Sequence, residues 1–156
     1  MQKIATCLWF DHQAEEAVNF YTSVFKNSKV GKLARYGDSG PGPKGSVMTA
    51  TFEIEGRDFM ALNGGPVFKF SPAISFVVNC GTQDEVDDYW NKLLEGGAPQ
   101  QCGWLTDKFG VSWQIVPTIL GELMADKDPQ KAGRVAQAMM KMIKLDIKTL
   151  KQAYEG

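Results

Sequence analysis

The sequence is poor in the residues on which metal and disulfide sites depend. It contains a single histidine, His12, which excludes metal sites built on two histidines and limits any Ser–His or Cys–His catalytic pair to that residue. Its three cysteines, Cys7, Cys80 and Cys102, are odd in number and have no C-x-x-C spacing. This argues against a secreted disulfide framework and against a structural zinc site, and it favours reduced thiols in a cytoplasm.

The chain also lacks a strong net charge and a long hydrophobic run. With 17 basic and 18 acidic residues it has no broad positive field, which argues against nucleic acid as a partner. The longest uncharged stretch, Phe70 to Gln83, is shorter than the roughly 20 apolar residues of a membrane span. The apolar run Ile4 to Phe10 is followed directly by Asp11 without a small-x-small cleavage site, so we expect neither a signal peptide nor a membrane partner.

Hydrophobic periodicity in the first half predicts a strand, a helix and three further strands. The strand Ile4 to Phe10 precedes apolar residues at helical spacing from Ala14 to Phe25. A glycine- and proline-rich loop, Gly37 to Gly45, and a tight Glu55-Gly56 turn separate the later strands. These strands are expected at Val30 to Tyr36, Val47 to Ile54 and Phe59 to Asn63.

A second cycle with the same order follows. Strands are predicted at Ile74 to Val78, Gln100 to Thr106 and Val111 to Val116, with a helix that begins at a Thr82–Glu85 capping box. At an offset of 68 residues the two halves match weakly in identity but coherently in pattern, which indicates a duplicated β-α-β-β-β unit. The expected fold is therefore α+β: two tandem modules, about 1–68 and 70–117, with curved mixed sheets around a pocket.

After Pro117 the sequence becomes helical. Asp128 can cap one helix, with Pro129 at its first position, and Asp146 can cap another. We therefore expect a C-terminal helical extension over about 118–156, in a chain of 156 residues that forms a single domain.

Several local strings resemble the PhnB-like branch of the vicinal oxygen chelate superfamily, which includes glyoxalases, bleomycin-resistance proteins and extradiol dioxygenases. The strings include Leu8-Trp9-Phe10-Asp11, Phe59 to Pro66, Cys102-Gly103-Trp104-Leu105 and Trp113-Gln114-Ile115-Val116-Pro117. The resemblance is expected to extend over the whole chain, including the C-terminal extension. It implies a curved sheet from each module around a pocket, and a homodimer.

The resemblance also implies four positions at which metal-dependent relatives hold metal ligands. Here they fall near Ile4, at Leu62 or Asn63, at Ala73 and at Gln114. Aliphatic side chains have no donor atom, and amide oxygens bind divalent ions weakly without help. We therefore expect no metal and no cofactor, with Gln114 either hydrogen-bonding in the pocket or satisfied as a buried amide.

Other candidate chemistry has a simpler structural interpretation. The cysteines have no nearby base, His12 lies at a strand–helix junction where capping or solvation is expected, and the Gly37 to Gly45 loop suits a lid or dimer contact. Branch members are often labelled demethylubiquinone methyltransferase-like, but the sequence has no glycine-rich strand–helix turn for S-adenosylmethionine. A basic stripe is expected to be a solvated helix face; it consists of Lys141, Lys144, Lys148 and Lys151.

Strand alternation predicts which residues face the pocket. Counting from the ligand positions places Thr6, Asn63, Ser75 and Gln114 there. Trp104 is a further candidate whose side stays open, because a bulge near Gly103 would turn it to the other face. Aromatic residues on predicted strands suit a planar or apolar ligand. We therefore predict metal-independent binding of a small molecule by a cytoplasmic homodimer. One alternative is an enzyme that uses an unrecognised polar set, or that recruits a metal through Gln114 and a carboxylate such as Glu53. The other alternative is a structural role, with the pocket collapsed by aromatic side chains.

Overall fold

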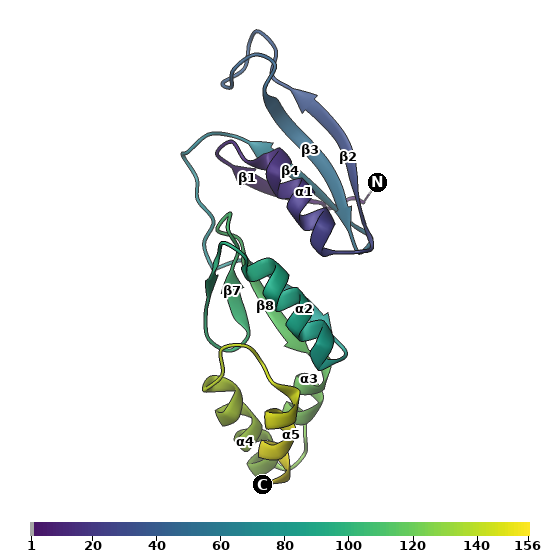
Figure 1. Cartoon of the computed structure of the whole chain (residues 1–156), viewed down its shortest axis with the longest axis vertical. Coiled ribbons are helices and arrows are strands. Elements are labelled where there is room, and N and C mark those ends of the chain that lie inside the picture. Colours follow the sequence, from purple (N-terminus) through teal and green to yellow (C-terminus); the bar gives the residue numbers. More distant parts are fainter. Residues whose placement is uncertain (1) are drawn as a thin grey trace. The chain divides into compact units, whose positions relative to one another are not determined.

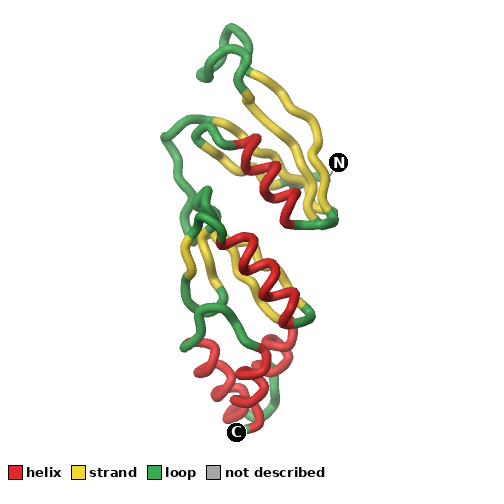
Figure 2. The backbone as a smooth tube through the Cα atoms, in the orientation of Figure 1, coloured by secondary structure: helices red, strands yellow, loops and turns green. Residues whose placement is uncertain are grey.

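The computed structural model describes residues 2–156 and divides the chain into two compact units, Met1–Phe70 (unit 1) and Ser71–Gly156 (unit 2). Each unit contains one four-stranded mixed sheet with a helix along one face (Figures 1 and 2). The predicted α+β class and the repeated β-α-β-β-β order are confirmed, although neither sheet closes on itself. The single-domain organisation stays a prediction. No helix within residues 2–156 has the length and apolar character needed to cross a bilayer.

Unit 1 has its strands in the order β1-β4-β3-β2, with β1 parallel to β4 and the other pairs antiparallel. The Glu55-Gly56 turn joins β3 to β4 with positive φ at both residues, as a two-residue hairpin requires. Its elements are β1 (Thr6–Phe10), α1 (Ala14–Val24), β2 (Ser28–Arg35), β3 (Val47–Ile54) and β4 (Arg57–Asn63).

Helix α1 covers one face of this sheet because its apolar residues at helical spacing are buried there: Ala14, Ala17, Val18, Tyr21 and Val24. Beneath it, Tyr21 stacks on Phe52 with 6.2 Å between ring centroids. Leu8 and Phe10 of β1 are buried on the same face. The opposite face, which no helix of the unit covers, is called the open face; on β1 it carries Cys7 and Trp9.

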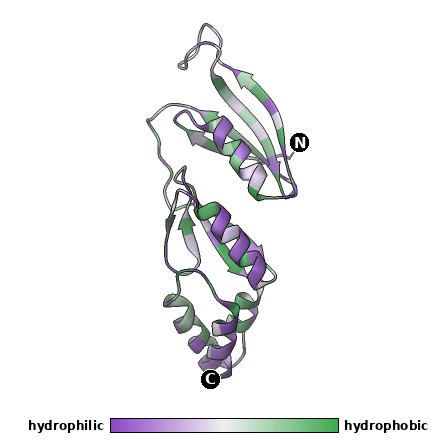
Figure 3. Ribbon diagram, in the orientation of Figure 1, coloured by the Kyte–Doolittle hydropathy of each residue, from purple (hydrophilic) through white to green (hydrophobic). Residues whose placement is uncertain are grey.

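Unit 2 repeats this plan with the strand order β5-β8-β7-β6 and with β5 parallel to β8. Thr82 caps α2 by accepting a hydrogen bond from the Glu85 amide, as its sequence predicts. Figure 3 shows much of α2 as hydrophilic and much of β8 as hydrophobic, which fits a helix with one solvated side. The elements are β5 (Ser75–Cys80), α2 (Gln83–Leu94), β6 (Ala98–Pro99), β7 (Trp104–Thr106) and β8 (Ser112–Pro117).

The strand expected at Gln100 to Thr106 is shorter than predicted. Cys102 and Gly103 both have positive φ, 61° and 83°, and this left-handed backbone interrupts the strand before Trp104. The remaining strand pairs with β6, which is only two residues long. The sheet of unit 2 therefore ends in a rudimentary strand.

The C-terminal extension forms three helices that gather at one end of unit 2 (Figure 1). They are α3 (Thr118–Met124), α4 (Pro129–Met140) and α5 (Ile147–Glu155). Asp128 and Asp146 cap α4 and α5, as predicted. The helices share a buried cluster of Leu120, Val135, Leu145 and Leu150. The extension is therefore folded onto unit 2 with an apolar core of its own.

Candidate functional site

Three predicted site residues meet on the open face of the unit 2 sheet. Gln114 pairs with Val77 on one side and with Trp104 on the other, and its Nε2 donates a 3.0 Å hydrogen bond to Ser75 Oγ. All three predicted residues are half-buried, and Val77 beside them is 51% exposed. The bond satisfies the Gln114 amide nitrogen and leaves its oxygen, the Ser75 hydroxyl proton and the Trp104 indole for other partners.

Thr6 and Asn63 lie on the helix-covered face of unit 1, the face opposite to the one expected. Thr6 lies two and four residues before the buried Leu8 and Phe10 and therefore shares their face, and Asn63 pairs with Phe10. Alternation was counted from Ile4, which lies before β1, and a shift of one residue exchanges the two faces of a strand. Whether either residue binds a ligand stays a prediction.

Asn63 has a clear structural role. Its Oδ1 accepts a 2.8 Å hydrogen bond from the Ala14 amide, and its Nδ2 donates a 3.1 Å bond to the Val47 carbonyl. A free amide at the start of α1 is thereby satisfied by a residue 49 positions later. Both polar atoms of the side chain have partners within the protein.

Register also decides between Leu62 and Asn63 as the counterpart of Gln114. Leu62 pairs with Trp9 on the open face, as Gln114 pairs with Val77. Of the four positions, Ile4, Leu62 and Ala73 have aliphatic side chains and Gln114 has an amide, so these residues do not fit a divalent metal ion. The carboxylate of Glu53 lies 3.5 Å from Lys29 Nζ. Within residues 2–156 no group of three or more His, Cys, Asp and Glu side chains is placed to hold a metal.

The aromatic residues divide between the two sides of the sheets. Trp9 and Trp104 are half-buried on the open faces, and Trp9 contacts Phe68 edge-on at 4.9 Å between centroids. Trp113 is buried on the helix-covered face, where its indole donates to Asp107 Oδ2 at 2.9 Å, and Phe52 belongs to the core below α1. The open faces therefore carry only part of the aromatic surface expected from the sequence.

The thiols have environments that disfavour the reactive thiolate. Burial, together with the neighbouring Glu85 carboxylate, raises the pKa of Cys80 to about 12. Partial desolvation against the sheet also raises the pKa of Cys7. A raised pKa lowers the thiolate fraction at neutral pH, so neither thiol is activated as a nucleophile.

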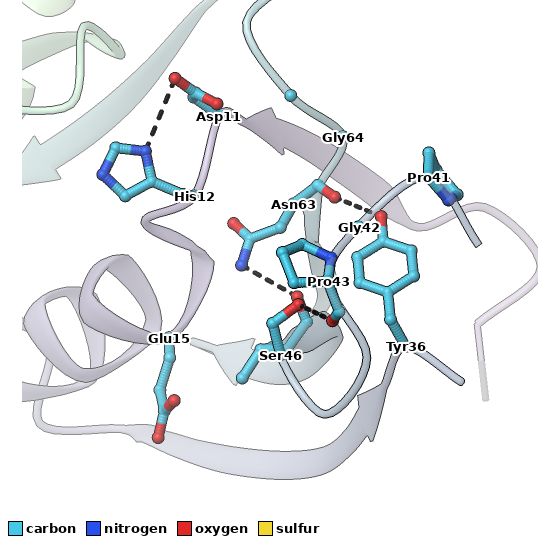
Figure 4. Close-up of a pocket in the computed structure, with 12 residues that line it drawn as sticks. Asp11, His12, Glu15, Tyr36, Pro41, Gly42, Pro43, Ser46, Asn63 and Gly64 are labelled. Atoms are coloured by element: carbon cyan, nitrogen blue, oxygen red, sulfur yellow. Dashed lines mark hydrogen bonds and ion pairs between the residues drawn. The ribbon is translucent and has the colours of Figure 1, made fainter. Parts of the chain in front are cut away.

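A cavity of about 360 Å³ lies entirely within unit 1 and was not foreseen from the sequence (Figure 4). It is found where the carboxyl ends of β1 and β4 meet the Gly37 to Gly45 loop. In Figure 4, Asp11, His12 and Glu15 lie on one side, and Tyr36 and the loop on the other. The only sequence signal was that loop, which was expected to be a lid or dimer contact.

The loop is fixed against Tyr36. The Tyr36 amide donates to the Ser46 carbonyl, the Gly45 amide donates to the Tyr36 carbonyl, both at 2.8 Å, and the Tyr36 hydroxyl donates to the Asn63 carbonyl. A Cβ atom at Gly42 would lie 2.3 Å from the Tyr36 ring, so glycine is needed for this approach. On the side of the cavity opposite Tyr36, His12 Nδ1 lies 3.5 Å from Asp11 Oδ2.

The turn after β4 does not form a nucleotide-binding loop. Gly64 and Gly65 lead into a loop that ends at β5, not into a helix, and the Gly65 carbonyl accepts a 2.9 Å bond from the Trp9 indole. A glycine-rich loop that cradles phosphate normally opens a helix, whose N-terminus contributes to binding.

Comparisons with known proteins agree with this architecture. A family model described as 3-demethylubiquinone-9 3-methyltransferase matches residues 2–116. The structure of a PhnB protein from Bacillus cereus is 42% identical, with a TM-score of 0.69, and the match covers 75% of this chain and 100% of that one. A Pseudomonas aeruginosa protein is 25% identical with a TM-score of 0.62, covering 75% and 98% of the two chains.

A more distant similarity concerns the fold alone. The fosfomycin resistance protein FosX from Mesorhizobium loti is 13% identical with a TM-score of 0.57, covering 81% of this chain and 100% of that one. No curated protein matches the chain. The family model ends at residue 116, so the expectation that the family resemblance includes the C-terminal extension stays a prediction. The chain belongs to the 3-demethylubiquinone-9 3-methyltransferase family, a PhnB-like branch of the vicinal oxygen chelate superfamily.

Proposed function

We propose that this protein binds a small planar or apolar molecule without a metal, on the open faces of its sheets, as a homodimer in the cytoplasm. The observation that carries the proposal is the group of Ser75, Trp104 and Gln114 on the open face of unit 2. An indole offers a flat apolar surface, and a serine–glutamine pair offers one acceptor and one donor beside it. Such a combination suits a flat ligand with a single polar edge.

The donor set and the exposed apolar surface support the metal-independent and dimeric parts of the proposal. Three of the four positions at which metal-dependent relatives hold ligands are aliphatic here, and the fourth, Gln114, offers an amide that binds divalent ions weakly. Val77 is 51% exposed and lies beside half-buried aromatic and amide groups, so a ligand or a second copy would gain by covering it. Methyl transfer is not proposed, because the glycine-rich turn after β4 does not open a helix.

Elemental analysis of the untagged protein is the first test. We expect less than stoichiometric zinc, manganese, nickel or iron after dialysis, and a sedimentation mass of twice 17.2 kDa. About one divalent metal per chain that survives dialysis would overturn the metal-independent proposal and favour an enzyme. A monomer at micromolar concentration would overturn the dimer.

Ligand binding is tested by tryptophan fluorescence with indole and 2-naphthol as planar probes and cyclohexanol as a non-planar comparison. We expect saturable binding of the planar probes, weakened about tenfold by Trp104→Ala through lost ring contact and about threefold by Gln114→Leu through one lost hydrogen bond. The matched control is Gln152→Leu on the exposed side of α5, which should not change the affinity. Equal binding by all variants, or binding of cyclohexanol as well as naphthol, would contradict the proposed site.

A further inference from the structure

The cavity lies at one edge of the unit 1 sheet, and the C-terminal extension contacts the corresponding edge of the unit 2 sheet. Because β1 is parallel to β4 and β5 is parallel to β8, the carboxyl ends of each pair meet at one edge of the sheet. At this edge of unit 2, Gln83 Nε2 donates to the Leu145 carbonyl at 3.1 Å and Gln83 Oε1 accepts from the Ile147 amide at 2.7 Å. The C-terminal extension thus packs against this edge of unit 2.

The side-chain donors on the cavity wall are already used within the protein, apart from His12. The Tyr36 hydroxyl donates to the Asn63 carbonyl, Asn63 Nδ2 donates to the Val47 carbonyl, and Ser46 Oγ donates to the Pro43 carbonyl. Two neighbouring backbone amides are used as well, because Gly64 N donates to Phe10 and Gly65 N to Asp11. These groups fix the wall and are not available to recognise a ligand.

The ionisable groups on the wall are mainly acidic. Asp11 and Glu15 supply two carboxylates, no Lys or Arg side chain lines the cavity, and within residues 2–156 the Glu15 carboxylate has no partner. The N-terminus of α1 carries about half a positive charge and by itself would favour an anion. However, the Ala14 amide already donates its hydrogen bond to Asn63 Oδ1, and Glu15 and Glu16 lie in the first turn of the helix, so the local charge is negative.

The rest of the wall is apolar and of suitable size. Pro41 and Pro43 lie on the side of the cavity opposite the carboxylates, and Val47 also lines it. A cavity of about 360 Å³ falls within the range of small-molecule sites, which is roughly 300 to 1,000 Å³. We propose that this cavity binds a small organic cation, an alkylammonium group whose charge meets Asp11 and Glu15 while its hydrocarbon part packs against the proline-rich loop.

The test is an NMR titration of the ¹⁵N-labelled full chain with choline, using 3,3-dimethyl-1-butanol as its neutral counterpart of the same shape. We expect saturable shifts of the Gly42, Gly64 and Gly65 amide signals with choline and none with the alcohol. Raising sodium chloride from about 0.02 M to 0.5 M should weaken binding, because charges near the surface are screened.

Variants separate this cavity from the surface charge of the helix. Asp11→Asn and Glu15→Gln should each weaken choline binding roughly twofold to fivefold, as partly exposed charge pairs do, and the double variant about tenfold. Glu16→Gln is the matched control: Glu16 lies in the same turn but does not line the cavity, and its variant should bind choline as the parent does.

The outcomes distinguish this site from the open-face site. Gln114→Leu should leave choline binding unchanged, so the cation site and the proposed function can fail separately. Three results would overturn the inference: amide shifts of equal size with the neutral alcohol, unchanged affinity in the Asp11→Asn/Glu15→Gln double variant, or no saturable shifts at any choline concentration up to about 50 mM. Melting temperatures of the variants within about 2 °C of the parent would exclude unfolding as the cause of a loss.

Discussion

Units 1 and 2 have equivalent strand orders but differ in what covers the edge of the sheet at the carboxyl ends of the parallel strands. In unit 2 the extension covers this edge: the Cys102 and Gly103 amides donate to the carbonyls of Met142 and Ile143 at 2.9 and 2.7 Å, and Leu145 lies against Gly103. In unit 1 a short loop covers it and leaves a cavity. A duplicated module thus has one edge that is contacted by added sequence and one edge that is covered by a loop over a cavity.

The two units also begin their helices differently. Thr82 caps α2 from the position immediately before the helix, with its side chain accepting from the Glu85 amide. At the start of α1 the side chain of Gln13 makes no cap, and Asn63 reaches from the end of β4 to accept from Ala14. One helix start is therefore stabilised locally and the other through tertiary structure.

The largest expected effect is the loss of stability when the C-terminal extension is loosened from the sheet of unit 2. Leu145 is fully buried, and Leu145→Ala should lower the free energy of unfolding by about 2 to 5 kcal/mol, because it removes apolar contacts and leaves a cavity. Urea denaturation followed by circular dichroism measures this loss. Ile143→Ala, in the same segment but 54% exposed, should cost less than about 1 kcal/mol. If the two variants were equally stable, the extension would be an appendage rather than part of unit 2.

A smaller effect compares the two helix caps. Asn63→Ala removes two hydrogen bonds and should cost about 2 kcal/mol, whereas Thr82→Ala removes one and should cost about 1 kcal/mol. The same urea titrations measure both, and Asn79→Ala, an exposed change in β5, is the control. A larger loss from Thr82→Ala than from Asn63→Ala would mean that the tertiary cap contributes less than the local one.

The smallest effect concerns two thiols on the corresponding strands β1 and β5. Iodoacetamide at pH 8 should alkylate the exposed Cys7 and leave Cys80 unmodified, because burial raises the Cys80 pKa to about 12 and excludes the reagent. Peptide mapping by mass spectrometry measures both rates. Alkylation of Cys80 as fast as Cys7 in folded protein would show that β5 is not protected by α2.

The same thiol gives stability a defined dependence on pH. Since the folded-state pKa of Cys80 lies above its ordinary value, the folded chain holds this proton more tightly than the unfolded chain does. The resulting stabilisation is complete below the ordinary pKa and is lost as the pH rises through about 12. Cys80→Ala should remove this part of the alkaline destabilisation in pH-dependent urea titrations.

Periodicity was sufficient to predict most of the secondary structure. The strand Val47–Ile54 has the predicted bounds, and Thr82, Asp128 and Asp146 cap helices where the sequence placed them. These features depend on neighbours within a few residues, so local sequence contains their cause. The Cys102-Gly103 interruption was foreseen only as a bulge near Gly103, because left-handed backbone at cysteine has no sequence signal.

The candidate sites could be predicted only in part. Ser75 and Gln114 lie together on the side expected from alternation along β5 and β8, and Trp104, whose side the sequence left open, pairs with Gln114. Thr6 and Asn63 lie on the other face, because the count started one residue out of phase. The cavity depends on Tyr36, Asn63 and Asp11, which are far apart in sequence and are brought together only by strand pairing.

The sequence by itself therefore determined the duplicated β-α-β-β-β order, the local helix caps and the family, all of which follow from patterns over short stretches. Tertiary structure decided which face each strand residue occupies, that Asn63 caps α1, and which edge is closed by the extension. The physical reason is that successive residues of a strand point to opposite faces, and that hydrogen bonds such as the one from the Ala14 amide to Asn63 Oδ1 join residues 49 positions apart.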